Sequence, residues 1–168
     1  YLWRVTGTSF FLTSFDFGPI PAGVEAVRLQ DAREGWVRYA AMPRVDGIGV
    51  GLHGTCTDLD VLDLRIEAGD GRGVDVQCTE GSDVNVAGGW LSLADGVSVV
   101  GSGVTVADNT FDGARLQLDA DVVVERNLFV ASDVPLEHLG GDLLFRGNIV
   151  EADRAATFGD GTIALLGN

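Results

Sequence analysis

The chain has 168 residues, and its 25 acidic and 11 basic side chains give a formal net charge of −14. A hydrophobic fraction of 46% and a mean hydropathy of +0.21 predict a folded domain rather than a disordered chain. The negative charge disfavours nucleic acid and anionic lipid as partners. All basic residues are Arg, which excludes mechanisms that need a catalytic lysine. No apolar run is long enough for a membrane span.

The sequence is predicted to form one β-helix domain, 1–168, with irregular N-terminal coils over 1–46 and regular coils over 47–168. Trp3–Phe10 and the stretch VRLQDA, which begins at Val27, are expected to be early copies of the repeat described below. Aromatic residues also gather in this region. We expect these side chains either to fill the interior of the first coils or to present exposed rings that stack on sugars. These aromatic residues are Trp3, Phe10, Phe11, Phe15, Phe17, Trp36 and Tyr39.

Five later segments share a template with apolar residues at its first, third and eighth positions. Asp-Gly followed by alternating apolar residues, as in DGVSVV and DGARLQL, recurs between them and predicts a turn and a second strand. A period of roughly 20 residues is too short to return through a helix, so each strand is expected to stack on its equivalent about 4.8 Å away. The segments are Leu59–Ile66, Val84–Leu91, Val104–Phe111, Val122–Phe129 and Leu143–Val150.

Asn occupies the sixth position of three of these segments, as Asn109, Asn127 and Asn148. Stacked amides can hydrogen-bond from one coil to the next, and Asn tolerates left-handed backbone geometry at a corner. The pattern therefore predicts an Asn ladder. The final stretch, TIALLGN, is either a second strand after Asp160-Gly161 or a new first strand that ends in a fourth ladder residue, Asn168.

The motifs VTVADNTFDG, VVVERNLFV and LLFRGNIVEA, interleaved with DG-V-x-V strands, resemble the parallel β-helix repeats of the pectin-lyase-like superfamily. The resemblance is strongest from Gly47 to Val150 and implies an all-β, right-handed parallel β-helix of roughly seven coils. It implies a fold rather than one enzyme, because the superfamily includes polysaccharide lyases, polyuronate hydrolases, epimerases and noncatalytic surface proteins. Neither end has an obvious cap, so we expect further solenoid coils or end-to-end self-association.

Cys56 and Cys78 lie about one coil apart, each shortly before a first strand. If their coils are adjacent and in register, the two Cα atoms lie near 5 Å apart, which permits a disulfide. Two buried thiols are the alternative. A disulfide would indicate an oxidising location, so we expect a secreted, periplasmic or cell-surface protein.

Two acidic columns are predicted, one before the first strands and one in the Asp-Gly turns. Carboxylates and turn carbonyls are ligands that Ca²⁺ prefers, so a calcium-binding edge is one interpretation, and no other cofactor is expected. The alternative is that each Asp serves an Asx turn and its charge is solvated. The first column is Asp58, Asp83, Asp121 and Asp142, and the second is Asp46, Asp70, Asp95, Asp112 and Asp160.

The outward position of the first strand is expected to place a polar column on the early coils. The superfamily resemblance implies a substrate groove along such a face. In that interpretation, Asp60 and Asp63 are catalytic carboxylates, Arg28 or Arg65 clamps the substrate and His53 is an acid or base. Arg4, Asn85 and Asp75 are then substrate-binding residues. The predicted column is Arg4, Arg28, Asp60, Asn85, Thr105, Val123 and Leu144, with His53, Asp63, Arg65, Asp75 and Glu80 around it.

No motif of the superfamily's known enzymes is present in the sequence. We therefore expect a noncatalytic structural or carbohydrate-binding module whose partner is a polysaccharide or cell-surface glycan. The alternative is a polyuronate lyase, epimerase or glycoside hydrolase, although a chain of charge −14 would repel a polyanion unless Ca²⁺ or an Arg groove intervened. An ice-binding solenoid is the third hypothesis, and TGTSFFLTS is its only Thr-rich stretch.

Overall fold

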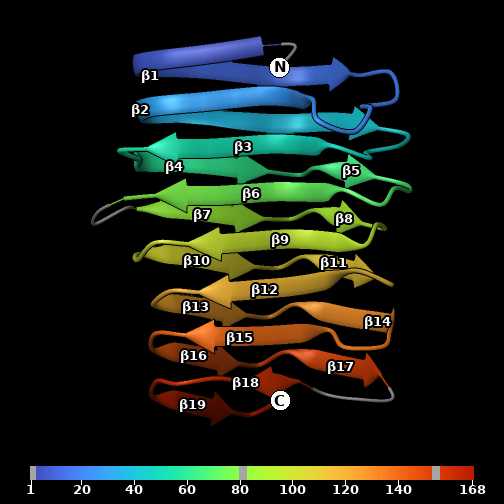
Figure 1. The fold of residues 1–168 in the computed structure, drawn as a ribbon, viewed down its shortest axis with the longest axis vertical. Helices are drawn as coiled ribbons and strands as arrows, with labels where there is room; N and C mark the ends of the chain where they lie inside the picture. Colours follow the sequence, from blue (N-terminus) through green and yellow to red (C-terminus); the bar gives the residue numbers. More distant parts are fainter. Residues whose placement is uncertain (1–2, 80–82, 153–155) are drawn as a thin grey trace.

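The computed structural model describes residues 3–79, 83–152 and 156–168, and these form strands and connecting turns without a helix. The strands pair in parallel and stack as a β-solenoid of about 7 turns, with the N-terminal coil at one end and the C-terminal coil at the other (Figure 1). The predicted all-β solenoid is therefore confirmed. In the described ranges, no helix is long and apolar enough to cross a membrane.

Each regular coil contributes one strand to each of three faces. The coil period thus includes a short strand that the sequence pattern did not separate from the neighbouring corner. Face 1 consists of β4 (Thr57–Leu62), β7 (Val84–Ala87), β10 (Val104–Ala107), β13 (Val122–Glu125), β16 (Leu143–Arg146) and β19 (Ile163–Leu166). Face 2 consists of β5 (Arg65–Ile66), β8 (Trp90–Leu91), β11 (Thr110–Asp112), β14 (Leu128–Ser132) and β17 (Ile149–Ala152). Face 3 consists of β3 (Ile48–Gly54), β6 (Arg72–Cys78), β9 (Asp95–Val100), β12 (Arg115–Asp119), β15 (Leu136–Gly140) and β18 (Thr157–Phe158).

The first two strands are long and each crosses more than one face. β1 (Trp3–Asp16) pairs along its length with β2 (Glu25–Met42), and β2 pairs successively with β3, β4 and β5. β2 turns its corners through left-handed residues, of which Asp31 has φ 51° and Tyr39 has φ 56°. The chain thus changes direction without interrupting the strand.

The register confirms the five-segment repeat and corrects its two early copies. Leu59 pairs with Val84, which pairs with Val104, and the same alignment continues through the last segment. Trp3 instead pairs with Val27, which pairs with Val50 on face 3, so both early copies begin on face 3 rather than on face 1. The C-terminal strand β19 pairs with β16, so TIALLGN is a first strand.

Apolar side chains fill the interior because alternate residues of each strand point inward. On face 1, Val104 and Val106 are buried while Thr105 between them is partly exposed. On face 2, the inward side chains include phenylalanines, and the rings of Phe111 and Phe129 stack with centroids 4.7 Å apart. The interior is therefore a set of stacked columns, each of which contacts its equivalents in neighbouring coils.

The Asn side chains form a hydrogen-bonded column at the corner between faces 1 and 2. The Nδ2 atom of Asn109 donates to Asn127 Oδ1 (3.1 Å), and Asn127 Nδ2 donates to Asn148 Oδ1 (3.0 Å). Asn148 Nδ2 donates in turn to Asn168 Oδ1 (3.3 Å). The left-handed residue at this corner is the one before each Asn, such as Arg126 with φ 56°, and not the Asn itself.

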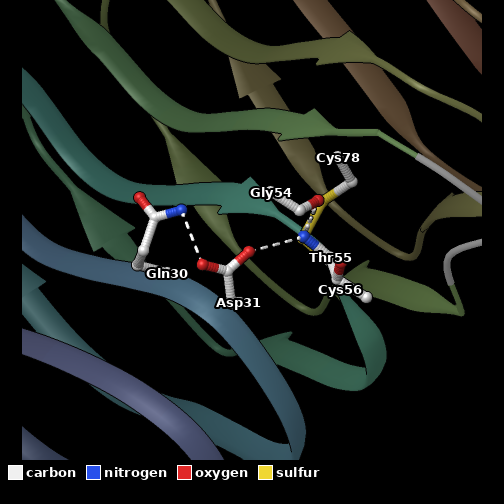
Figure 2. The surroundings of a disulfide bond; sticks show 6 residues. All are labelled: Gln30, Asp31, Gly54, Thr55, Cys56 and Cys78. Carbon is white, nitrogen blue, oxygen red and sulfur yellow. Dashed lines mark hydrogen bonds between the residues drawn. A yellow bond between two sulfur atoms is a disulfide. The ribbon is translucent and has the colours of Figure 1, made fainter.

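A disulfide joins the corner between β3 and β4 to the end of β6. Cys56 and Cys78 have Cα atoms 5.7 Å apart, which confirms the predicted pair. Figure 2 shows that Asp31 lies beside the same corner, where its Oδ1 atom accepts a hydrogen bond from the Thr55 backbone N–H (3.1 Å). This hydrogen bond holds the pKa of the Asp31 carboxyl below its ordinary value. The disulfide thus links two consecutive coils where a side chain already bonds to the backbone.

Candidate functional site

The residues predicted to carry catalysis and substrate binding lie on different faces. Arg4, Arg28, His53 and Asp75 belong to face 3, and their registers place Arg28 beside Gly51 and Gly51 beside Asp75. Asp60 and Asn85 are paired on face 1, Asp63 is at the corner after β4, and Arg65 is on face 2. Glu80 lies outside the described residues.

The predicted outward column is therefore wrong at its first two positions. Arg4 and Arg28 align with each other on face 3, whereas Phe11 and Trp36 align with Asp60 on face 1. The error has a physical origin: β2 supplies strands to faces 3, 1 and 2 in turn without an Asp-Gly turn at its corners. The actual face 1 column is Phe11, Trp36, Asp60, Asn85, Thr105, Val123, Leu144 and Ala164.

Face 3 holds a cluster of paired charges over β2, β3 and β6. Glu25 accepts hydrogen bonds from Arg28 Nη1 (3.2 Å), and its Oε1 atom lies 3.0 Å from His53 Nε2. Arg28 also donates to Gln30 Oε1 (3.0 Å). Glu25 and His53 are largely buried, with 14% and 13% of their side-chain surfaces exposed. The structure thus brings Arg28 and His53 together through Glu25, which the sequence analysis missed.

Asp75 completes this cluster although its side chain is only 1% exposed. Its Oδ1 atom accepts a hydrogen bond from Arg72 Nη1 (3.1 Å), and its Oδ2 atom accepts one from Gln77 Nε2 (2.8 Å). A buried carboxylate is strongly destabilising unless it is paired, and these two hydrogen bonds explain how the Asp75 carboxylate can be buried. The face-3 cluster is defined here as Glu25, Arg28, His53, Arg72 and Asp75.

Gly51 is the residue that allows Glu25 and His53 to lie over the strand. A Cβ atom at position 51 would lie 2.7 Å from His53 Nε2 and 3.2 Å from the Glu25 carboxyl carbon. A sequence signal for this face was available, because Val27, Val50, Val74 and Val97 each open an alternating stretch 23 or 24 residues after the previous one. Aligning these stretches would have placed Arg28, Gly51 and Asp75 in one column.

The other predicted catalytic residues make local pairs. Asn85 Nδ2 donates to Asp60 Oδ1 (3.2 Å) across face 1, and Arg38 Nε donates to Asp63 Oδ2 (3.0 Å) at the next corner. Arg65 Nε donates to Glu67 Oε1 (3.1 Å) on face 2. Asp60 and His53 therefore do not form one constellation.

Face 1 carries a shallow groove that runs from coil to coil beside the outward column. Its larger part has a volume of about 540 Å³ over β10, β13, β16 and β19, and a smaller hollow of about 220 Å³ lies over Asp58 and Asp60. The floor is mainly apolar, with Val123, Leu144 and Ala164 in register. Asp83 lines both parts, so they adjoin each other along the corner between faces 3 and 1.

The acidic column predicted before the first strands forms the edge of this groove. Asp121 Oδ1 accepts a hydrogen bond from the Asp142 backbone N–H (2.8 Å), and Asp142 Oδ1 accepts one from the Thr162 N–H (3.0 Å). Gly103 takes the place of an Asp between Asp83 and Asp121. In the three described ranges, no group of three or more His, Cys, Asp or Glu residues could hold a metal ion. The edge thus has a backbone-bonding role, and calcium binding there has no support from the geometry.

The acidic column predicted in the Asp-Gly turns is only partly a column. Asp46 and Asp70 are neighbours, because Asp46 Oδ1 accepts a hydrogen bond from the Asp70 backbone N–H (3.3 Å) and Arg44 binds both carboxylates. Asp112 instead ends β11 in register with Val130 on face 2. Asp160 follows β18, at the corner that leads to face 1. These two residues were therefore assigned to the wrong column.

Exposed aromatic rings stand at the N-terminal end of the same face 1 column. Phe11 and Trp36 are 60% and 39% exposed, and their ring centroids lie 4.3 Å apart with a tilt of 47°. Trp3 packs edge-on against Phe15 and Phe17, which suits the filling of an early coil. The pair Phe11 and Trp36, called the aromatic pair below, presents ring surface to solvent from the outward column of face 1.

Comparisons with protein-family models, curated proteins and solved structures found no match to this chain.

Proposed function

We propose that this protein is a noncatalytic, secreted or surface-associated module that binds a polysaccharide along face 1. The observation that carries the proposal is the aromatic pair, which lies in the same register column as the floor of the groove. An aromatic ring that is half exposed loses apolar surface to water when a sugar stacks on it. The groove then continues the contact from coil to coil.

The spacing of the solenoid suits an extended polymer. Successive outward side chains on face 1 are about 4.8 Å apart, a repeat similar to that of one sugar unit in an extended chain. The polar side chains of Asp60 and Asn85 lie between the aromatic pair and the apolar floor. Such an alternation of apolar surface and a few oriented polar groups is typical of ligand-binding sites.

The disulfide supports a location outside the reducing cytosol, because disulfides persist in oxidising compartments. The repeat motifs that resemble the pectin-lyase-like superfamily are a second support for a carbohydrate partner, since that superfamily contains many proteins that act on or display polysaccharides. On the first of these grounds we propose a secreted, periplasmic or cell-surface location.

The test is binding of the whole chain to a panel of soluble neutral, acidic and amino polysaccharides, measured by affinity electrophoresis and calorimetry. We expect Phe11→Ala and Trp36→Ala each to weaken binding at least tenfold. Trp90→Ala is the matched control, because Trp90 is 50% exposed but belongs to face 2. Equal losses from Trp36→Ala and Trp90→Ala, or no binding by the wild-type chain, would remove the proposal.

A second candidate function is hydrolysis or elimination at the face-3 cluster. The specific observation in its favour is the Gly51 position, which leaves room for Glu25 and His53 beside the carboxylate of Asp75. A carboxyl and an imidazole could share general acid and base roles there. Against it, each carboxylate is already bonded to Arg28 or Arg72, which suits a structural network.

Activity assays separate these two candidates. The polysaccharide panel is incubated with the protein, and new reducing ends and the ultraviolet absorbance of unsaturated uronates are followed. Product that disappears in Glu25→Gln, while the thermal unfolding midpoint is preserved, would establish the second candidate. Absence of product, with binding retained, supports the noncatalytic module.

A further inference from the structure

We infer that the face 1 groove selects an uncharged polysaccharide and rejects polyuronates. This inference rests on the proposed function and specifies its ligand class. It opposes the alternative hypothesis of a polyuronate-active enzyme, against which the net charge of −14 already argues. It follows from the charge of the groove lining and from the hydrogen-bonding capacity of the groove edge.

The described residues that line the groove include five carboxylates and no basic side chain. A polyuronate carries one carboxylate per sugar, so each bound unit would lie close to a like charge in a partly desolvated setting. Polyuronate binding therefore needs a cation that the lining does not supply. The five carboxylates are Asp58, Asp60, Asp83, Asp121 and Asp142.

Three arginines near the other edge of face 1 are bonded to carboxylates outside the groove. Arg38 binds Asp63, Arg126 binds Asp108 through Nη2 (2.8 Å), and Arg146 Nε binds Glu125 (2.6 Å). Hydrogen bonds from Arg126 hold the pKa of Asp108 below its ordinary value, so that carboxylate stays charged at neutral pH. Recruiting one of these arginines to a uronate would leave a carboxylate without its partner.

The edge of the groove is equipped to accept hydrogen bonds from hydroxyl groups. Asp121 and Asp142 each use Oδ1 to accept a backbone N–H, and no described residue bonds to their Oδ2 atoms. Both side chains are exposed at the rim. Ionised carboxylates act only as acceptors, so they complement the hydroxyls of a neutral sugar. The apolar floor of Val123 and Leu144 complements the C–H face of the same sugar.

The experiment compares hydroxyethylcellulose, a neutral glucan, with polygalacturonate in the presence of a chelator. We expect the wild-type chain to bind the neutral polymer at least tenfold more tightly. The double variant Asp121→Asn/Asp142→Asn keeps the Oδ1 acceptors and removes two charges, so it should narrow that ratio by improving polygalacturonate binding. Asp112→Asn/Asp133→Asn removes the same charge away from the groove and should leave the ratio unchanged.

Each outcome has a definite meaning. Wild-type binding of polygalacturonate within a few-fold of the neutral polymer would overturn the inference and leave the proposed function standing. An equal change of the ratio in both double variants would also overturn it, because the effect would then come from net charge. If a soluble glucosamine polymer binds more tightly than the neutral glucan, the inference of an uncharged ligand is wrong and the preferred ligand is cationic. Failure to bind any polysaccharide would remove the proposed function and this inference together.

Discussion

At the scale of single residues, the Asn column shows how one side chain serves two coils. Asn127 Oδ1 accepts hydrogen bonds from the backbone N–H and the side-chain amide of Asn109, while its Nδ2 atom donates to the carbonyls of Val106 and Glu125. Corner backbone groups have no partner in a strand, so a buried corner requires such a substitute. The amide supplies hydrogen-bond partners for these groups.

We predict that Asn127→Leu lowers the free energy of unfolding by about 1 to 3 kcal/mol, because it leaves buried donors and acceptors unpaired. Equilibrium denaturation with urea measures this change. Asn85→Leu is the control, since Asn85 is partly exposed on face 1 and its side chain donates a hydrogen bond to Asp60. Equal effects from the two variants would contradict the ladder's contribution to stability.

A pH dependence follows from Glu125, which is bound by Arg146 and Arg126 and is only 9% exposed. Hydrogen bonds from Arg146 and then Arg126 hold the pKa of Glu125 below its ordinary value. A depressed carboxyl pKa stabilises the fold above the unfolded-state pKa of about 4.3, and this stabilisation is lost as the pH falls through the folded-state value.

The wild-type chain should therefore be more stable than Glu125→Gln at pH 7, and the difference should shrink below pH of about 4.3. Thermal unfolding followed by circular dichroism across this range measures the difference. Glu151→Gln, at an exposed position on face 2, provides the comparison. A constant difference between wild type and Glu125→Gln at all pH values would refute the linkage.

At the scale of elements, the regular coils were predictable and the first two strands were not. From Leu59 onward, the same set of apolar positions repeats with each coil, and Asp-Gly turns and the Asn column recur in several coils. The local sequence pattern therefore agrees with the stacking of the strands. β2 turns its corners at residues such as Asp31 and Glu34, which adopt positive φ without Gly. No turn signal marks these positions, and the early face 1 and face 3 strands were therefore exchanged.

The candidate site was less predictable than the fold for the same reason. Column membership depends on register, and an error in the first coils moved Arg4 and Arg28 to the wrong face. Asp75 reads as an exposed strand residue in the sequence, yet Arg72 and Gln77 cover it. Such coverage depends on side chains from neighbouring positions and has no single-residue signature.

The disulfide between β6 and the corner before β4 gives a prediction for these elements. We expect Cys56→Ser/Cys78→Ser to lower the free energy of unfolding by about 3 kcal/mol, because the bridge closes a loop with a sequence separation of 22. Denaturation of both proteins with and without a reductant measures the effect. The reductant should destabilise only the wild-type chain, and a variant as stable as the oxidised wild type would contradict the prediction.

At the scale of the whole molecule, the charge of −14 is spread over a stack of coils in which equivalent residues recur about every 4.8 Å. Several carboxylates are paired with arginines, but 25 acidic residues cannot all find partners among 11 basic ones. The unpaired carboxylates repel one another along the length of the solenoid, and this repulsion lowers the stability of the folded state.

We therefore predict that the thermal unfolding midpoint rises when sodium chloride is increased from about 0.01 to 0.5 M, because salt shortens the Debye length from about 30 Å to a few ångströms. Differential scanning calorimetry measures the midpoint. Sodium chloride and potassium chloride should act alike, which separates screening from binding of a specific ion. A falling midpoint would show instead that the Arg–carboxylate pairs dominate the electrostatic stability.

The alignment of Val84, Val104 and Val122 in one register has a consequence for how such a chain can change its size. Removal of residues 104–121 would take one member from every inward and outward column and leave Val122 opposite Val84. Each coil is thus a repeating unit, and the solenoid can lengthen or shorten by one coil, about 4.8 Å, while the packing of the interior is preserved. If a polymer binds along face 1, the length of polymer in contact with the protein would increase by the same step with each added coil.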